Sequence, residues 1–230
     1  SGTGAMATTD FSQADMGDNP AVNLATGRLR YSFDDLSVGY GNFAVNVGHV
    51  YLSQHFSAFV NKFPELSSGW KLNVAQYIVF NSSSSSLTPY ALYMDEAGEV
   101  HRFVKFDDTR YYDERNAKVT LNYADTNTYL EDGVGNRIYF DRYGRITRKI
   151  SCHDSAMVKS YIYDDNHRLI TVYDSRNYNR HSGQANPRIE FTYDDDNRLI
   201  SATAYAGKIL SGVTYGYDSN GRLTQVNRVA

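Results

Sequence analysis

The sequence is poor in the features that mark disulfide-stabilised proteins, membrane spans and nucleic-acid binders. Its one cysteine is Cys152, so no disulfide can form within the chain. No apolar run approaches the roughly 18 residues that cross a bilayer, and the N-terminus lacks the basic-then-apolar pattern of a secretion signal. Lysine and arginine together number 23 against 26 aspartates and glutamates, and no segment collects one sign. We therefore predict no membrane span and no nucleic-acid partner.

Charged residues that favour helices are also scarce. The sequence has 20 Asp but 6 Glu, and 16 Arg but 7 Lys. Glu and Lys favour helices, whereas Asp favours turns. The chain also has 20 tyrosines, and tyrosine favours half-buried pleated sheet. From Leu24 onward short alternating stretches are separated by turn residues, and no window of about eleven or more residues has a helical period. The sequence predicts an all-β chain.

A short repeat occurs four times in the second half of the chain. It consists of an aromatic residue, Asp, two variable residues, then Gly, His or Asn, then Arg, then Leu or Ile. The copies span 140–146, 163–169, 193–199 and 217–223, and their aspartates are 23, 30 and 24 residues apart. The candidate structural residues are Phe140, Asp141, Gly144, Arg145, Tyr163, Asp164, His167, Arg168, Tyr193, Asp194, Asn197, Arg198, Tyr217, Asp218, Gly221 and Arg222.

The spacing within the repeat is that of a tight hairpin turn. An Asp at the first turn position accepts hydrogen bonds from backbone N–H groups further along. A three-residue hairpin loop ends in a left-handed residue, a position that suits Gly, Asn and His. The same spacing also begins at Asp95, Asp113, Asp132 and Asp174. Eight residues are therefore predicted to have positive φ: Gly98, Asn116, Gly135, Gly144, His167, Asn177, Asn197 and Gly221.

These turns together predict the architecture. One or two short strands fit between consecutive turns, which gives hairpin after hairpin. The predicted fold is an antiparallel meander that forms a curved, spiralling sheet, as a section of a shell or an open barrel.

The repeat resembles the YD repeat, also called the RHS repeat, whose signature is Tyr-Asp followed by Gly-Arg-Leu. The segments 22–29, 45–54 and 69–73 resemble the opening block of large bacterial YD-repeat proteins. The likeness covers most of residues 20–228. The copies depart from the signature where Phe140 replaces Tyr and where His167 and Asn197 replace Gly.

The resemblance implies a secreted or cell-surface bacterial protein with a hollow shell of spiralling β-sheet, often enclosing a C-terminal toxin domain. It implies that this chain is the N-terminal part of such a shell and that its wall is not a catalyst. The implied partners are the remainder of the parent protein, with further repeats and a toxin domain. Residues 1–19 are interpreted as a tag remnant and flexible N-terminus, 20–90 as the opening block, and 91–230 as repeat hairpins.

The sequence contains one weak candidate for a catalytic site. Cys152, His153 and Asp154 are adjacent, but neighbouring side chains of a strand point to opposite faces. Adjacency therefore does not supply the contact that a nucleophile and its base need. We predict no catalytic residue and no enzymatic activity.

The sequence patterns that could indicate a metal site are also weak. The stretch Asp194–Asn197 resembles the acidic half of a calcium loop, but Tyr205 stands where that loop needs a Glu. His49 and His55 lie too far apart on a straight strand to share an ion. His101 and His181 have no Cys or His nearby in the sequence. We predict no metal site and no cofactor.

The tyrosines leave two functions open. Tyr163, Tyr193 and Tyr217 recur at one place in the repeat, which favours a structural role in which each ring packs on the neighbouring strand. The alternative is a binding module that recognises carbohydrate or a cell-surface partner through a tyrosine-rich sheet face. Buried rings favour the first function, and a contiguous exposed patch favours the second.

The end of the sheet carries a further prediction. A strand at 226–230 would have an unpaired edge, and such an edge invites pairing with another chain. We expect self-association through this edge, or its coverage by residues 11–22.

Overall fold

The computed structural model describes residues 20–23, 28–39, 44–52, 56–63, 65–67, 69–81, 89–124, 126–153, 158–174, 178–179, 184–185 and 187–229. Regular structure in this part of the chain consists of β-strands and one 3-10 turn, η3 (Ser57–Phe59). Predictions that involve His55, Asp154, Asn177 and His181 fall outside the described residues.

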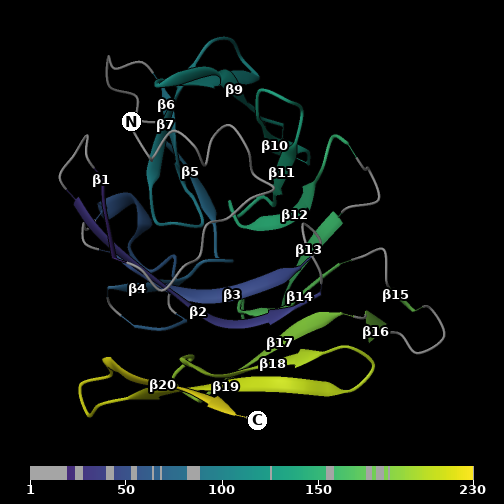
Figure 1. Cartoon of the computed structure of the whole chain (residues 1–230). Coiled ribbons are helices and arrows are strands. Elements are labelled where there is room, and N and C mark those ends of the chain that lie inside the picture. Colours follow the sequence, from purple (N-terminus) through teal and green to yellow (C-terminus); the bar gives the residue numbers. More distant parts are fainter. Residues whose placement is uncertain are drawn as a thin grey trace.

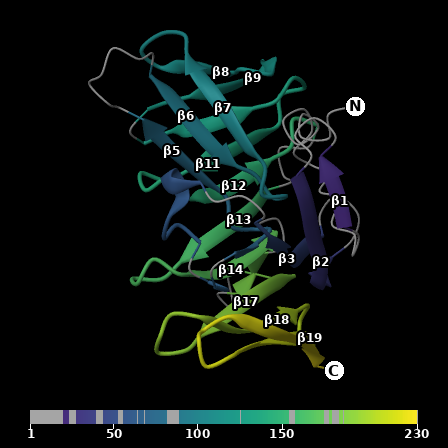
Figure 2. The same ribbon diagram turned by 90° about the vertical axis from the view of Figure 1, so that its left-hand side faces the viewer.

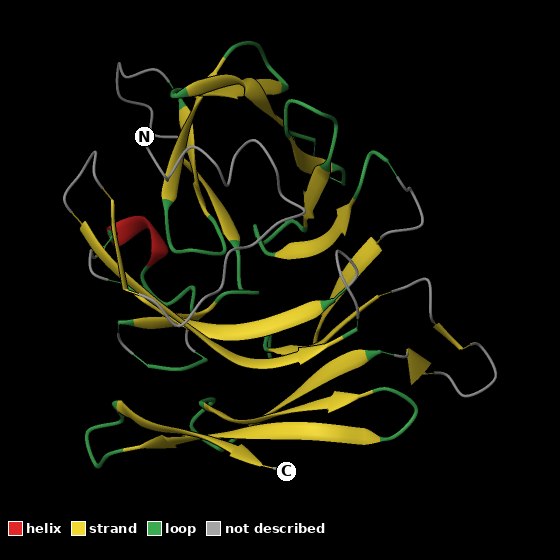
Figure 3. Cartoon of the chain, viewed as in Figure 1, coloured by secondary structure: helices red, strands yellow, loops and turns green. Residues whose placement is uncertain are grey.

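The strands form two main sheets and a small ribbon (Figures 1 and 3). The four-stranded sheet has the order β1 (Pro20–Asn23), β2 (Arg28–Val38), β3 (Val45–Tyr51), β4 (Trp70–Leu72). The ribbon pairs β15 (Tyr178–Asn179) with β16 (Gln184–Ala185). The change from the first sheet to the next falls between β4 and β5, inside the segment 20–90 that the sequence groups as one block.

The 14-stranded sheet follows chain order from β5 to β20, apart from the ribbon between β14 and β17. Its strands are β5 (Tyr77–Asn81), β6 (Tyr90–Met94), β7 (Val100–Lys105), β8 (Arg110–Asp113), β9 (Asn116–Asn122), β10 (Thr128–Glu131), β11 (Arg137–Phe140), β12 (Ile146–Ile150), β13 (Val158–Tyr163), β14 (Leu169–Asp174), β17 (Arg188–Tyr193), β18 (Leu199–Tyr205), β19 (Ile209–Tyr217) and β20 (Leu223–Val229). Neighbouring strands are antiparallel. The predicted all-β meander of hairpins is confirmed.

The large sheet is a strip that curls until its first strand meets a later turn (Figure 2). Tyr77 at the start of β5 forms an isolated bridge with Arg145. The Ile78 N–H donates to the Gly144 carbonyl at 2.8 Å, and the Ile146 N–H donates to the Gln76 carbonyl at 3.1 Å. Strands β13 to β20 continue the strip beyond this meeting point, so the strip is a spiral rather than a closed ring.

The four-stranded sheet packs against the later part of the spiral. Strand β2 contacts β18 and β19, and β3 contacts β14. One hydrophobic core joins the two sheets, with Val45 and Leu72 from the first and Val172 and Ala204 from the second. This arrangement buries a face of both sheets, which neither sheet could do alone.

The predicted turn geometry is confirmed at six of the seven predicted positions that the structure describes. Gly98, Gly135, Gly144, His167, Asn197 and Gly221 have φ between 63° and 97°. Each donates its N–H to the carbonyl of the Asp three residues earlier, as in the turn at Asp164 and His167 (3.0 Å). In each turn the Asp N–H also donates to the carbonyl four residues later, which completes the three-residue loop.

The prediction for Asn116 is wrong. Asn116 is the first residue of β9 and pairs with Asp113, so the loop between β8 and β9 contains only Glu114 and Arg115. In this shorter hairpin the left-handed position after the turn does not exist. The Asp113 carboxylate instead accepts the Arg115 N–H at 2.8 Å.

Two glycines of the turns offer a matched test of the contact between β5 and the turn at Gly144. Gly135 and Gly144 both have positive φ, but a Cβ at Gly144 would lie 2.1 Å from the Ile78 carbonyl oxygen, whereas one at Gly135 would be 3.4 Å from the nearest atom. Gly135→Ala should cost about 1 to 2 kcal/mol of stability from backbone strain alone. Gly144→Ala should cost clearly more, because the β5 backbone must also move.

Urea denaturation of both variants measures the difference. Equal losses of stability for the two variants would contradict the contact between Gly144 and β5.

Candidate functional site

The repeated turn is built around the Asp carboxylate. In the second copy, Asp164 Oδ1 accepts the N–H groups of Asn166 (3.0 Å) and Arg168 (2.9 Å). Its Oδ2 accepts the Arg168 Nε–H at 2.8 Å. The other three copies repeat these three hydrogen bonds around Asp141, Asp194 and Asp218. Both oxygens of each carboxylate thus accept hydrogen bonds from donors that lie at most four residues later in the chain.

The hydrogen bonds stabilise the charged carboxylate. The backbone N–H of Arg198 is the main cause that lowers the pKa of Asp194, and that of Arg222 does the same for Asp218. A charged Asp aligns the following Arg, since the Arg Nε–H donates to its Oδ2. The Asp therefore determines where the guanidinium of its own repeat lies.

The aligned Arg then joins its repeat to the next one. The guanidinium of Arg145 lies 4.0 Å from the ring centroid of Tyr163, that of Arg168 5.0 Å from Tyr193, and that of Arg198 5.1 Å from Tyr217. These are cation–π contacts between consecutive copies of the repeat.

The tyrosine hydroxyl completes the same joint. Tyr163 donates its O–H to the Ile146 carbonyl (2.7 Å), Tyr193 to Leu169 (2.6 Å) and Tyr217 to Leu199 (2.7 Å). The acceptor in each case belongs to the Leu or Ile that ends the preceding copy. Each repeat tyrosine is thus bound by two residues of the copy before it. We call this set of contacts the Arg–Tyr joint.

The left-handed residue of the turn also contacts the preceding copy. Arg145 Nη1 lies 3.3 Å from His167 Nδ1, and Arg168 Nη1 donates to Asn197 Oδ1 at 3.2 Å. The sequence explained His167 and Asn197 only by their tolerance of positive φ. Their contacts with the preceding Arg could not be seen locally, because the partners are 22 and 29 residues apart.

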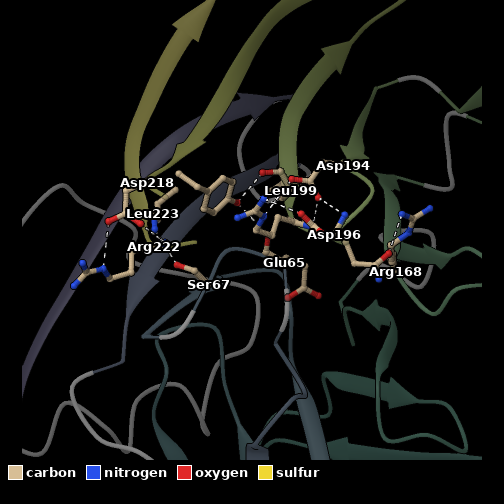
Figure 4. Close-up of polar contacts among 12 residues, drawn as sticks. Glu65, Ser67, Arg168, Asp194, Asp196, Leu199, Asp218, Arg222 and Leu223 are labelled. Atoms are coloured by element: carbon tan, nitrogen blue, oxygen red, sulfur yellow. Dashed lines mark hydrogen bonds and ion pairs between the residues drawn. The ribbon is translucent and has the colours of Figure 1, made fainter. Parts of the chain in front are cut away.

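A separate segment, residues 65–67, runs across the ends of the later hairpins (Figure 4). The Leu199 N–H donates to the Glu65 carbonyl at 2.6 Å, and the Leu223 N–H donates to Ser67 Oγ at 3.0 Å. The Tyr217 hydroxyl reaches the same Glu65 carbonyl at 3.2 Å. The strand register shifts at each of these turns, next to Tyr193 and Tyr217. The segment thus satisfies N–H groups at the bulges of the ladder.

Glu65 brings a buried carboxyl group to this contact. Burial raises the pKa of Glu65 to about 7, and its Oε2 is buried without a hydrogen-bond partner among the described residues. Lys71 is also fully buried, and burial lowers its pKa to about 8. Its Nζ donates to the Leu72 carbonyl at 2.8 Å. Sequence reasoning assigned no role to either residue: Glu65 belongs to no motif, and Lys71 stands only as one position of the segment 69–73.

His101 lies between two carboxylates that the sequence did not bring together. Its Nε2 is 2.7 Å from Asp95 Oδ2, and its Nδ1 is 3.6 Å from Asp113 Oδ2. Burial alone would lower its pKa, but the close carboxylate of Asp113 and the hydrogen-bonded carboxylate of Asp95 raise it to about 9. Asp95 and Asp113 begin two of the predicted turns, so the protonated His101 links neighbouring hairpins.

Asp35 connects the two sheets. Its Oδ2 accepts the Tyr215 hydroxyl of β19 at 3.1 Å and lies 2.8 Å from Nδ1 of His49 on β3. The His49 ring stacks on Phe33. Asp35 occupies the bulge of β2, which turns its side chain toward the spiral.

The structure also describes several of the residues that were considered for catalysis and for calcium binding. Cys152 is a free, exposed thiol, and His153 is exposed beside it. At the tip of the third turn, Asp196 pairs with Arg198 at 3.1 Å, and both oxygens of Asp194 accept protein donors. Among the described residues no group of three His, Cys, Asp or Glu side chains is arranged to hold a metal ion.

The fold and its joints define a structural β-repeat module, in which consecutive copies of the repeat bind one another through the same side chains. A family model of the RHS repeat matches residues 193–230, which include the third and fourth copies. The predicted RHS repeat is thus confirmed for this part of the chain. No curated protein matches the chain.

Removal of single hydroxyls tests the Arg–Tyr joint. Tyr163→Phe, Tyr193→Phe and Tyr217→Phe should each lower the free energy of unfolding by about 1 to 2 kcal/mol, because a carbonyl of the preceding copy loses its partner. Tyr143→Phe is the control, since Tyr143 lies at a turn tip with 46% of its surface exposed. That variant should stay within about 0.5 kcal/mol of the unchanged chain. Losses no larger than the control's would contradict the joint.

The buried Glu65 predicts a pH dependence of stability. The unfolded chain releases the Glu65 proton near pH 4.5, whereas the folded chain holds it up to about pH 7. The contribution of Glu65 is therefore fully present below pH 4.5 and decreases as the pH rises to 7. Glu65→Gln should remove this decrease, which amounts to at most about 3 kcal/mol.

Urea unfolding at pH 4.5, 6 and 7.5 measures the effect, with the exposed Glu114→Gln as control. An identical pH slope in the unchanged chain and the Glu65→Gln variant would show that Glu65 titrates normally.

Proposed function

We propose that the chain is a section of the wall of a YD/RHS-repeat shell that encloses or presents a toxin or effector domain. The observation that carries this proposal is the Arg–Tyr joint, which repeats between all four copies of the motif. A joint that repeats in one register lets a sheet extend by adding hairpins, as a wall requires. The remainder of the parent protein is then the natural partner.

The chemistry of the repeat supports a non-catalytic role. Its carboxylates accept backbone and arginine donors, its arginines cover tyrosine rings, and its hydroxyls donate to carbonyls. Catalytic groups need a free proton or lone pair directed at a substrate. In the joint these groups are engaged with one another.

Carbohydrate recognition through the repeat tyrosines has less support. Tyr163, Tyr193 and Tyr217 are half-buried and packed against the core, with their hydroxyls bonded to backbone. The exposed aromatic residues of the described part are others: Phe106 (67%), Tyr143 (46%), Tyr51 (39%), Tyr123 (39%) and Tyr112 (38%). The repeat itself therefore does not present a tyrosine-rich binding face.

A location at the bacterial cell surface or outside the cell is part of the proposal, since shells of this kind deliver or display their contents there. Among the described residues no helix has the length and apolar character to span a bilayer.

Limited proteolysis of the parent protein tests the enclosure. The proposed toxin or effector segment should be cleaved more slowly in the native protein than after the wall is opened. Combining Arg168→Ala with Tyr193→Phe breaks one joint and should speed cleavage of that segment at least several-fold. Arg115→Ala, an exposed arginine outside the joints, is the control.

Near-UV circular dichroism verifies that each variant keeps its tertiary packing. A toxin or effector segment that is cleaved equally fast in the native protein and in the opened variant would rule out enclosure.

A further inference from the structure

A cavity with about 300 Å³ of empty space lies where the four-stranded sheet meets the spiral. Strand β3 runs beside β13 and β14 at this place (Figures 1 and 2). The lining of the cavity comes from β3, the turn after β4, the turn between β6 and β7, and the strands β13 and β14. These segments are far apart in the sequence, so the cavity forms only when the two sheets pack together.

Tyr161 brings a hydroxyl without a partner to this cavity. The residue is 6% exposed, and among the described residues its hydroxyl forms no hydrogen bond. The next tyrosine on the same face of β13, Tyr163, donates its hydroxyl to the Ile146 carbonyl. Burial raises the pKa of Tyr161 well above its ordinary value, so the hydroxyl keeps its proton. Because buried hydroxyls normally have a partner, this one is an available donor.

Lys159 adds an ammonium group to the same wall. It lies two residues before Tyr161 on β13, and alternate side chains of a strand share a face. Lys149 occupies the paired position on β12, so two like charges lie opposite each other. Lys149 Nζ forms an ion pair with Glu96 Oε1 at 2.7 Å. In the part of the chain that the structure describes, Lys159 Nζ has no hydrogen bond and no ion pair.

The charges around Lys159 compensate its ammonium group poorly. Burial is the main cause that lowers the pKa of Lys159 to about 8, and the charge of Lys149 lowers it further. The charges of Glu96 and of Asp174, which occupies the paired position on β14, raise this pKa, but they do not restore the ordinary value. An anion in the cavity would stabilise the charged amine.

The rest of the lining determines which anion fits. Val45, Val74 and Val172 are buried and supply an apolar wall. The side chain of Asn73 is already bonded to the backbone through both of its amide atoms. A carboxylate with a short alkyl chain satisfies the donors of β13 and the valines together, because the cavity volume is at the lower end for ligand pockets. A multiply charged anion would bring excess negative charge close to Glu96.

We propose that this cavity binds a short-chain aliphatic monocarboxylate, whose oxygens accept hydrogen bonds from Lys159 Nζ and the Tyr161 hydroxyl while its alkyl chain contacts the three valines. Because such a ligand touches both sheets, it binds only the folded chain and stabilises it. The site uses no residue of the Arg–Tyr joints, so it is independent of the wall function.

Calorimetric titration of the whole chain with sodium propionate tests the proposal. We expect saturable binding of one propionate per chain. Propionate should also raise the urea midpoint of unfolding, and an equal concentration of sodium chloride should not. Propionamide has the same shape without the charge and should bind at least about 10-fold more weakly. Formate should bind more weakly as well, because it lacks the carbons that contact the valines.

Matched variants show whether the ligand lies in the cavity. Lys159→Met removes the ammonium group and should weaken propionate binding at least about 10-fold. Tyr161→Phe removes the hydroxyl and should weaken binding about 3- to 10-fold. Lys118→Met, at an exposed lysine of β9, is the control and should leave the dissociation constant within twofold. Urea unfolding curves verify that each variant is folded.

The pH dependence of binding gives a readout that a purely structural role of Lys159 would not change. Propionate binds the charged form of Lys159, so its affinity should decrease as the pH rises through about 8. Three results would each overturn the proposal: no saturable binding, equal losses for Lys159→Met and Lys118→Met, or an affinity for propionate that is the same at pH 7 and pH 9.5.

Discussion

The Asp carboxylate at the start of each repeat turn is the constraint on which the rest of the structure depends. It accepts two backbone N–H groups, which shapes the loop, and one Arg Nε–H, which aligns the guanidinium. The guanidinium then covers the next tyrosine, whose hydroxyl bonds back to the preceding copy. Local turn geometry and contacts between hairpins therefore depend on the same few atoms.

A spiral sheet has an apolar face and an irregular backbone that need partners, and the part of the chain before β6 supplies both. The four-stranded sheet shares the hydrophobic core of the strip. Residues 65–67 and 76–78 take up N–H groups next to the bulges of β12, β18 and β20. A buried N–H without a partner costs about 1 to 3 kcal/mol, so these contacts matter as much as apolar burial.

Ionisable groups gather where the two parts meet. Glu65 belongs to the segment 65–67 and Lys71 to β4, and both are buried. Asp35, which lies against His49, accepts the hydroxyl of Tyr215 from the spiral. Such groups are stable in the interior only when their partners are well placed. Their positions make the contact between the sheets specific, and they give it a dependence on pH that an apolar contact would lack.

The match of the RHS repeat model to residues 193–230 covers the most regular part of the chain. The earlier copies keep the hydrogen bonds of the Asp turn although two residues differ: Phe140 lacks the tyrosine hydroxyl, and His167 replaces glycine while keeping positive φ. In the hairpin at Asp132 the Arg is replaced as well, and Asn136 donates to the carboxylate in its place. The Asp turn therefore also forms in hairpins that lack the full sequence motif.

The sequence by itself determined the meander, six of its turns and the structural use of the repeat tyrosines, because an Asp turn is completed within five residues and a strand's alternation is local. It did not reveal the shorter hairpin before Asn116, since that loop depends on how β8 and β9 pair. Only the tertiary structure decided that residues 65–67 lie across the repeat and that Glu65 and His101 are buried among charges. The hydrogen bond from Tyr217 to Glu65 spans 152 positions of the sequence, and that from Leu223 to Ser67 spans 156. No local pattern encodes a contact over such a separation.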